Sequence, residues 1–244
     1  MGRLMRFSYA LSVAGIVGMT LVPATSASAE EANSIRAMEE WYGGFRAILA
    51  FTDSDEPTLA NPPAAGTFGQ KNDGSEVNGG PGFMIGYNWA KDYDLPIRTE
   101  LQVDYRGRHD ADSRLFVNPA QSFDYDLNVD SLDVMVNVLY DFETGSWWQP
   151  YVGAGVGWSH LEAEGSRRNT LIATEEDFDG TADNFAWSLQ AGVMFDVIDS
   201  FALELGYRYV ALGDITPDAV STGDQVSLDG LESHELIIGS IFKF

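Results

Sequence analysis

The sequence predicts an all-β fold, a closed up-and-down barrel of eight antiparallel strands that crosses a membrane. Three observations lead to this prediction. Apolar residues alternate with polar or small ones at a period of two, eight such segments are long enough to cross a bilayer, and the connections between them are alternately short and long. The chain has 244 residues, of which 45% are hydrophobic, so one domain with a sizeable core is expected.

The first 29 residues have the pattern of a secretory signal peptide. Arg3 and Arg6 precede an apolar run over 7–22, and small residues at 27–29 form a cleavage site. The run is shorter than the roughly 20 residues that span a bilayer, so a cleaved signal is favoured over an anchor. We therefore expect an exported protein.

The remainder of the chain divides into two parts. Residues 30–40 are expected to form a short periplasmic segment, and residues 41–244 the barrel domain. No later stretch stays apolar for about 18 residues, so any membrane crossing must be made by strands. The clearest strand is 97–106, where Ile, Thr, Leu, Val and Tyr alternate with Arg, Glu, Gln, Asp and Arg.

The eight predicted strands share this alternation and a length that crosses a bilayer with tilt. They are 41–51, 81–90, 96–106, 130–142, 150–161, 185–197, 201–212 and 233–244. Their short connections are 91–95, 143–149 and 198–200, and their long ones are 52–80, 107–129, 162–184 and 213–232. The long connections hold most of the Pro, Gly, Asp and Glu, so we expect solvated loops that all lie at one end of the barrel.

The face opposite the apolar one is small, as at Gly153, Gly155 and Gly157, which favours the narrow interior of an eight-stranded barrel. Aromatic residues are expected in two girdles at the membrane interfaces, which a soluble barrel does not require. The girdle at the short connections comprises Trp41, Trp89, Tyr140, Phe142, Trp147, Trp148, Phe195, Phe201, Phe242 and Phe244. The girdle at or near the long connections comprises Phe51, Phe83, Tyr105, Trp158, Phe185, Trp187, Tyr207 and Tyr209. The apolar face is therefore expected to contact lipid.

Charged residues of both signs are then expected to point into the lumen. They are Arg46, Arg98, Glu100, Asp104, Arg106, Asp133, Glu204, Arg208, Glu235 and Lys243. Because an unpaired charge in a confined interior is costly, a structural network of ion pairs is favoured. A gated or conductive pathway is the alternative, although eight strands leave no wide lumen.

Three segments, 150–158, 204–209 and 234–244, resemble the small outer-membrane β-barrel family of Gram-negative bacteria, the OmpA-like and Opa-like surface proteins. The last strand, which ends in Phe244 with apolar residues at most alternate positions, is similar to the signal read by the barrel-assembly machinery; Ser240 departs from the alternation. The resemblance covers about 41–244. It implies a place in the outer membrane and a role in membrane integrity, adhesion or immune recognition, with no shared chemistry.

The sequence assigns no catalytic, cofactor-binding or metal-binding residue. The glycines at 153, 155 and 157 lack the helix that follows a nucleotide-binding loop. Ser159 and His160 suggest a lipid A acyl-transfer site, but neighbouring strand residues point to opposite faces, so His109 or His234 would have to take part. Polar residues at the barrel rim are the favoured interpretation.

Two acidic segments are candidates for cation binding. The segment 175–183 begins like a calcium loop but has Ala186 where the bidentate Glu belongs, so a solvated acidic loop is favoured and a calcium or magnesium site stays open. The segment 124–130 has Val129 where the sharp turn needs glycine, and we expect it to be a strand that continues beyond the membrane.

Net charge and cysteine content exclude several classes of function. With 37 Asp and Glu against 14 Lys and Arg, the formal net charge is −23, which argues against nucleic acid. No cysteine is present, which excludes a disulfide framework and a thiol nucleophile. We expect a non-enzymatic structural or surface-interaction protein, adhesin- or antigen-like, that acts through acidic extracellular loops. A small-solute channel, a lipid A-modifying enzyme and a soluble exported eight-stranded binding barrel are the alternatives. The expected surroundings are outer-membrane lipid and lipopolysaccharide, and a monomer is expected because a closed barrel has no edge strand.

Overall fold

The computed structural model describes residues 40–70, 76–221 and 223–244, so the predicted signal peptide 1–29 and most of segment 30–40 lie outside the described residues. Eight long strands are β1 (Trp41–Asp53), β4 (Glu76–Asn88), β5 (Ile97–Asp110), β7 (Gln121–Asp141), β8 (Trp148–Asn169), β9 (Thr174–Ile198), β10 (Phe201–Ile215) and β11 (Gln225–Lys243). Shorter elements are β2 (Thr58–Ala60), β3 (Thr67–Gln70), β6 (Ser113–Asn118) and α1 (Ala90–Tyr93). Within the described residues, no helix is long and apolar enough to span a membrane.

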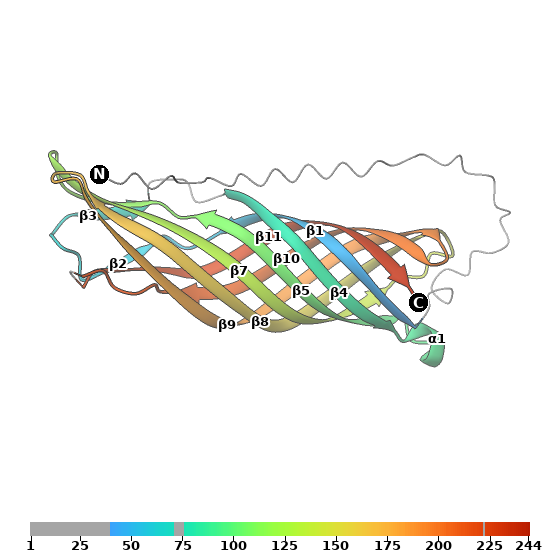
Figure 1. Cartoon of the computed structure of the whole chain (residues 1–244). Helices are drawn as coiled ribbons and strands as arrows, with labels where there is room; N and C mark the ends of the chain where they lie inside the picture. The colour runs from blue at the N-terminus through green and yellow to red at the C-terminus, as the bar shows by residue number, and fades with distance from the viewer. Residues whose placement is uncertain (1–39, 71–75, 222) are drawn as a thin grey trace, which may run out of the picture. The chain divides into compact units, whose positions relative to one another are not determined.

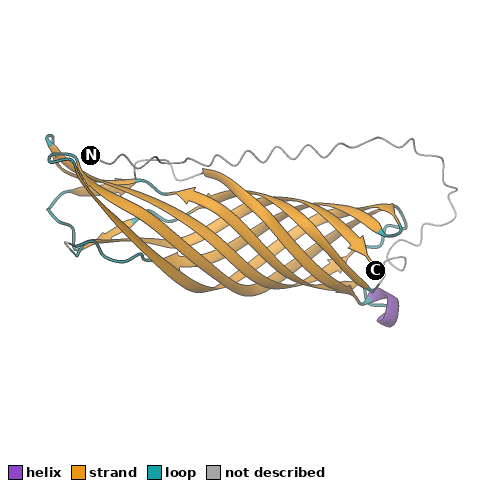
Figure 2. Ribbon diagram, viewed as in Figure 1, coloured by secondary structure: helices purple, strands orange, loops and turns teal. Residues whose placement is uncertain are grey.

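The eight long strands form a closed antiparallel ring (Figure 1). Its order is β7-β5-β4-β1-β11-β10-β9-β8, and the pairing of β7 with β8 completes it. Consecutive long strands are neighbours, and the first pairs with the last, with Tyr42 opposite Lys243. The predicted fold class and all eight predicted strands are therefore confirmed, and the strands run obliquely around the barrel (Figure 2).

The long connections differ from the prediction, because most of their residues are strands rather than solvated loops. β7, β8 and β9 have 21, 22 and 25 residues and pair with one another along almost their whole length. β5 and β6 follow one another along one side of β7, and β3 pairs with β6. β2 pairs with the start of β11. The expectation that 124–130 continues a strand is confirmed, since it lies within β7.

The side chains of these strands change their polarity along the barrel. Toward the end of β7, polar Asp133 and Asn137 point inward and Val136 points outward. Nearer the start of the same strand, Leu127 and Val129 are buried inside, and acidic residues take the outward positions. A bilayer surrounds a barrel with apolar medium, whereas water requires the apolar residues inside. The inversion therefore marks the edge of the membrane.

We call the part beyond this inversion the extension; it comprises residues 54–70, 107–130, 161–184, 210–221 and 223–232. Its two sheets, β3-β6-β7-β8-β9 and β10-β11-β2, enclose an apolar core. The core residues are Ala111, Leu115, Phe123, Tyr125, Leu127, Val129, Leu161, Ala163, Phe178, Val210, Leu212, Ile215, Val220, Val226, Leu228 and Leu231. The long connections thus fold into a body with a core of its own.

Candidate functional site

An apolar belt surrounds the barrel between the short connections and the extension. In β8 the large outward side chains of Trp148, Val152, Val156 and Trp158 are 40–54% exposed. A segment of this length matches the roughly 9–11 residues with which a tilted strand crosses a bilayer. So large a continuous apolar surface would aggregate in water, so the belt requires lipid.

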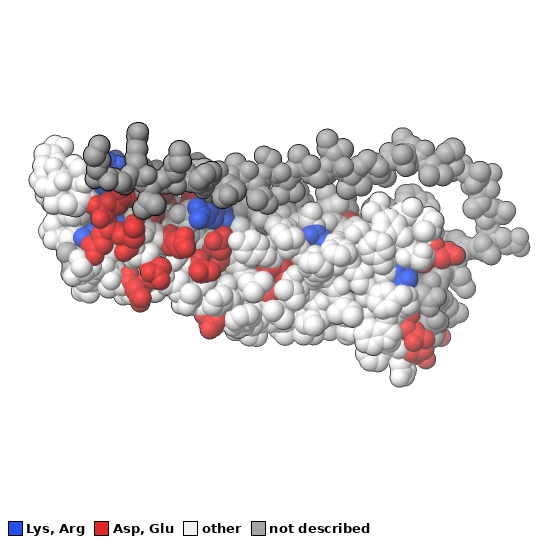
Figure 3. Space-filling view, in the orientation of Figure 1, with Lys and Arg blue, Asp and Glu red and all other residues white. Residues whose placement is uncertain are grey.

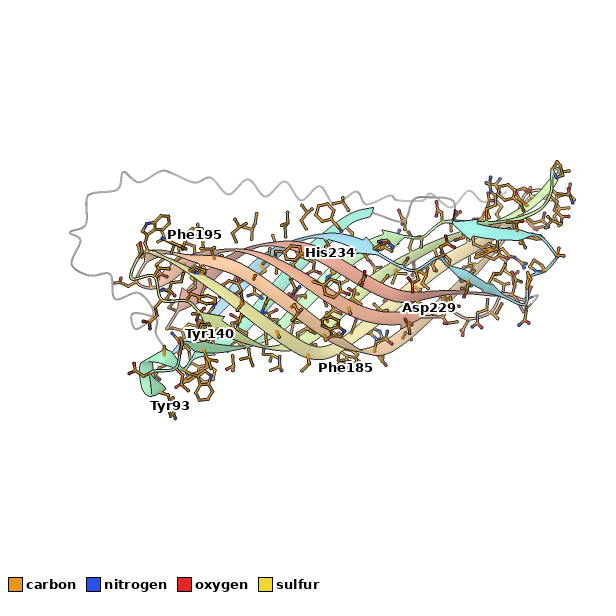
Figure 4. The ribbon with its side chains drawn as sticks, turned by 180° about the vertical axis from the view of Figure 1, so that it is seen from behind. Tyr93, Tyr140, Phe185, Phe195, Asp229 and His234 are labelled. Carbon is orange, nitrogen blue, oxygen red and sulfur yellow. The ribbon has the colours of Figure 1, made fainter. Side chains whose placement is uncertain are left out.

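Aromatic side chains gather at both edges of the belt, as expected. Figure 4 shows Tyr140 and Phe195 toward the short-connection end and Phe185 and His234 nearer the extension. Ring pairs at the short-connection end are Trp41–Tyr87, Tyr87–Trp89, Trp89–Tyr93, Tyr140–Phe142, Trp147–Phe195 and Phe201–Phe242. Phe83 is an exception to the prediction. It lies opposite Phe45, with ring centroids 4.7 Å apart, and not near Phe51, which lies closer to the long-connection end of β1.

The lumen holds all ten charged residues that the sequence placed there, and each is buried. Every luminal arginine contacts two carboxylates. Arg46 binds Glu204 at 2.8 Å and Glu100 at 2.9 Å, and Arg98 binds Asp141 at 2.7 Å and Glu100 at 3.2 Å. Arg208 binds Asp104 and Glu235, both at 2.6 Å, and Arg106 binds Asp133 and Glu235. Lys243 binds Asp196 at 2.5 Å. The predicted ion-pair network is therefore confirmed.

Two tyrosines that the sequence analysis did not single out as part of the network complete it. The hydroxyl of Tyr42 donates to Glu100 at 2.8 Å, and that of Tyr151 donates to Glu204 at 2.6 Å. The Arg98 guanidinium lies 5.6 Å from the Tyr42 ring centroid and 5.3 Å from that of Tyr151. Bulky rings and paired charges thus fill the lumen at this level.

Glycines on the inward face make room for these rings, as the sequence predicted. A Cβ at Gly86 would overlap the Tyr42 ring, and one at Gly192 would lie 2.6 Å from the Tyr151 hydroxyl oxygen. Inward packing therefore explains why glycine recurs in strands, where it costs stability by itself.

A buried polar cluster fastens the parts of the extension together. Asp224, which precedes β11, accepts hydrogen bonds from Arg167 of β8 and from the Tyr125 hydroxyl of β7, both at 2.6 Å. Arg167 also binds Glu176 of β9 at 2.9 Å, and Glu176 accepts a bond from the Ser221 backbone N–H at 2.6 Å. Interaction with the Ser221 side chain, together with this backbone bond, lowers the pKa of Glu176, while burial and the neighbouring Asp224 raise the pKa of Tyr125. The cluster links β7, β8 and β9 to the segment that precedes β11.

The outward face of β7, β8 and β9 in the extension is acidic. Asp130 lies directly opposite Glu162, and Glu164 directly opposite Asp179. Burial, together with the charges of Glu162 and Glu164, raises the pKa of Asp130. Arg108 offsets part of this charge, with its guanidinium 3.7 Å from Glu164. In Figure 3 the Asp and Glu atoms gather over this half of the barrel.

The segment 175–183 lies inside strand β9 and is not the loop that we expected. Its alternation exposes Glu175, Asp177 and Asp179 on one face and turns Phe178 into the core of the extension. A strand separates alternate carboxylates instead of wrapping them around one point, so a loop of the calcium-binding type is absent there. Among the described residues, no three His, Asp or Glu side chains gather as a metal site.

The structure separates the residues of the acyl-transfer alternative. Ser159 is fully buried in the lumen, and its hydroxyl hydrogen-bonds to no described side chain or backbone group. His160 points outward, stacks on Trp158 and has its Nδ1 2.7 Å from the Asp183 carboxylate. His234 also points outward and pairs with the Tyr207 hydroxyl at 2.6 Å. His109 is buried inside. Ser159 and His160 therefore lie on opposite faces, as predicted.

Comparisons with known proteins agree with this geometry. Residues 15–235 match the profile of a family described as "Outer membrane protein beta-barrel domain". The Outer membrane protein PagN of Salmonella typhimurium is 30% identical over 141 residues, which are 56% of this chain and 59% of PagN. An uncharacterized protein of Brucella suis is 27% identical over 154 residues, 57% of this chain and 54% of that protein. The matches thus span less than two thirds of either relative. The crystal structure of the outer membrane protein OprG from Pseudomonas aeruginosa shares the fold with a TM-score of 0.54 and 13% identity, over 85% of this chain and 98% of OprG.

Proposed function

Because the chain belongs to the outer membrane protein beta-barrel domain family, we propose that it is a non-enzymatic surface-interaction protein whose extension meets partners outside the cell. It is an integral outer-membrane β-barrel in a lipid environment. In such barrels the long connections face outward from the cell and the short ones face the periplasm. This orientation places the extension at the cell surface.

The observation that carries the proposal is the core of the extension. An interaction surface gains affinity when it is ordered before binding, because less entropy is lost on association. The two sheets around the apolar core and the cluster of Arg167, Asp224 and Glu176 hold the outward acidic face in one arrangement. A protein that served only to fill the membrane would not need so large an ordered body beyond it.

The proposal is tested by adherence of bacteria that produce the full chain to monolayers of cultured animal cells. We expect more adherence than with cells that lack the protein, and a decrease when Asp130→Asn, Glu162→Gln and Glu164→Gln are combined. Glu143→Gln, an exposed neutralisation at the short-connection end, is the matched control and should change nothing. Equal adherence with and without the protein would refute the role.

The filled lumen makes a small-solute channel the weaker candidate. Each luminal arginine holds two carboxylates, so an open path would require several buried pairs to separate. Planar-bilayer recordings of the purified barrel should therefore show no discrete conductance steps. The lipid A-modifying alternative predicts a change in lipid A mass on expression, and we expect none.

We also propose that the signal peptide is cleaved and that the last strand directs assembly of the barrel. Cleavage after Ala29 would give a mature chain that begins at Glu30, which N-terminal sequencing can test. The last strand, which ends in Phe244 and pairs with β1, would be read by the barrel-assembly machinery. The closed ring favours a monomer, measurable by sedimentation in detergent.

A further inference from the structure

Three described segments at the outer end of the extension carry no charge, although the chain has 37 acidic and 14 basic residues. The uncharged segments are 57–70, 115–123 and 169–174. They lie together, because β3 pairs with β6 and the Thr170 backbone N–H donates to the Ser122 carbonyl at 3.0 Å. In Figure 3 this end of the molecule is white, in contrast to the acidic surface behind it.

The turn between β8 and β9 presents aliphatic side chains at this end. Leu171 is 57% and Ile172 64% exposed. The next residue, Ala173, has a φ of 52°, a left-handed conformation that Gly or Asn adopts at lower cost. Three consecutive turn positions are therefore apolar where polar residues would suit both water and the backbone. Stability of the extension does not explain this choice.

Several polar groups of the turn have hydrogen-bond partners within the protein. Thr170 Oγ1 donates to the Ser122 carbonyl at 2.9 Å and accepts from the Ser122 N–H at 2.8 Å. The Leu171 N–H donates to the Asn169 side chain at 3.0 Å. A segment that leaves water for lipid needs such internal partners, because each unsatisfied group is costly to bury. The same bonds tie the β8–β9 turn to the start of β7 and hold it in place.

We propose that Leu171 and Ile172 insert into the headgroup region of an apposed membrane of neutral phospholipid, such as phosphatidylcholine. The inference rests on the proposed surface-interaction role and adds to the acidic face a second contact, with lipid, at the tip. Directly behind the tip, Arg168 lies between Asp124 and Glu175, and more carboxylates follow along the sheet. This charge repels an anionic surface and leaves a neutral one accessible. The side chains of Leu171 and Ile172 also carry no hydrogen-bonding group that a protein partner could recognise.

The experiment uses the full barrel in nanodiscs and vesicles of pure phosphatidylcholine. The chain has no cysteine, so Leu171→Cys can carry a single polarity-sensitive fluorophore. We expect its emission to shift to shorter wavelength when vesicles are added, with no shift for label at Thr181→Cys, an exposed position on the outward face of β9. In vesicle flotation, Ile172→Asp should reduce the bound fraction at least tenfold, whereas Thr181→Asp, which adds the same charge, should leave it within twofold. Including about one third phosphatidylserine should also reduce binding.

Absence of vesicle binding by the unmodified protein, or equal binding by Ile172→Asp and Thr181→Asp, would overturn the inference. If adherence to animal cells requires Ile172 but protease treatment of those cells abolishes it and vesicles do not bind, the partner is a protein and the lipid assignment is wrong. If Ile172→Asp bacteria still adhere normally, the surface-interaction role stands and this inference fails. Heat-modifiable gel mobility confirms that each variant is folded.

Discussion

Arg98 offers a direct measure of what the luminal ion pairs contribute. Its guanidinium donates to both oxygens of Asp141, at 2.7 and 2.9 Å, and both side chains are buried. Arg98→Met removes the cation and leaves the Asp141 carboxylate without its partner in the lumen. Breaking a buried pair in this way costs about 3–5 kcal/mol. Loss of the contacts with the Tyr42 and Tyr151 rings adds about 1 kcal/mol.

The double variant Arg98→Met with Asp141→Leu separates the cost of an orphaned charge from the cost of changed packing. Glu100 keeps Arg46 and the Tyr42 hydroxyl as partners in both variants. We therefore expect the double variant to recover at least about 2 kcal/mol relative to the single one, because no buried charge is left alone.

The free energy of unfolding is measured by urea titration of the barrel in lipid vesicles, followed by tryptophan fluorescence and by gel mobility without boiling. If Arg98→Met loses less than about 1 kcal/mol, or if the double variant is destabilised by the sum of the two single substitutions, the pair is not buried as described. The reasoning about the lumen would then be refuted.

Three further predictions concern packing and the extension. Gly192→Ala places a Cβ 2.6 Å from the Tyr151 hydroxyl oxygen and 2.7 Å from a backbone carbonyl. The free energy of unfolding measured in urea should therefore fall by about 1–3 kcal/mol. Asp224→Asn removes the charge that Arg167 holds at 2.6 Å, and limited proteolysis of whole cells should then cleave residues 216–224 faster, while unchanged cleavage would argue against the cluster. Because the pKa of Glu176 is lowered in the folded protein, its stabilisation is present above its unfolded pKa and is lost as the pH falls through the folded value. Protection of the extension should accordingly decrease on acidification, and Glu176→Gln should weaken that pH dependence.

The membrane part of the fold could be predicted from the sequence because its signal is local. Each strand between the girdles alternates lipid-facing apolar residues with small or charged luminal ones, and a period of two needs no tertiary information. The luminal charges followed from the same parity, so all ten predicted positions are buried and paired. The partners of each arginine could not be predicted, because they come from strands as distant in the chain as β1 and β10.

Most of the extension differs from the loops that the sequence predicts, for a definite physical reason. Its strands also alternate, but with acidic residues outward and apolar ones inward, so segments such as 175–183 look like solvated acidic loops when judged by composition. Phe178 and Leu161 are the local signals of a buried face, since each is an apolar residue that alternates with outward carboxylates. The sequence predicts a strand that continues past the membrane only at 124–130, and nothing local assigns the apolar residues of the other segments to a shared core.

The sequence by itself therefore determined the number of strands, their order, the lipid-facing side and the residues of the lumen, because the bilayer imposes one polarity rule on every strand. Only the tertiary structure decided what the long connections become. The two sheets of the extension meet through apolar residues from β6 to β11. The polar cluster around Asp224 joins this residue to Tyr125, which lies 99 positions earlier in the chain. Such contacts depend on closure of the barrel, which brings the strand ends to one place and leaves an uncharged turn at Leu171 and Ile172 as the outermost surface.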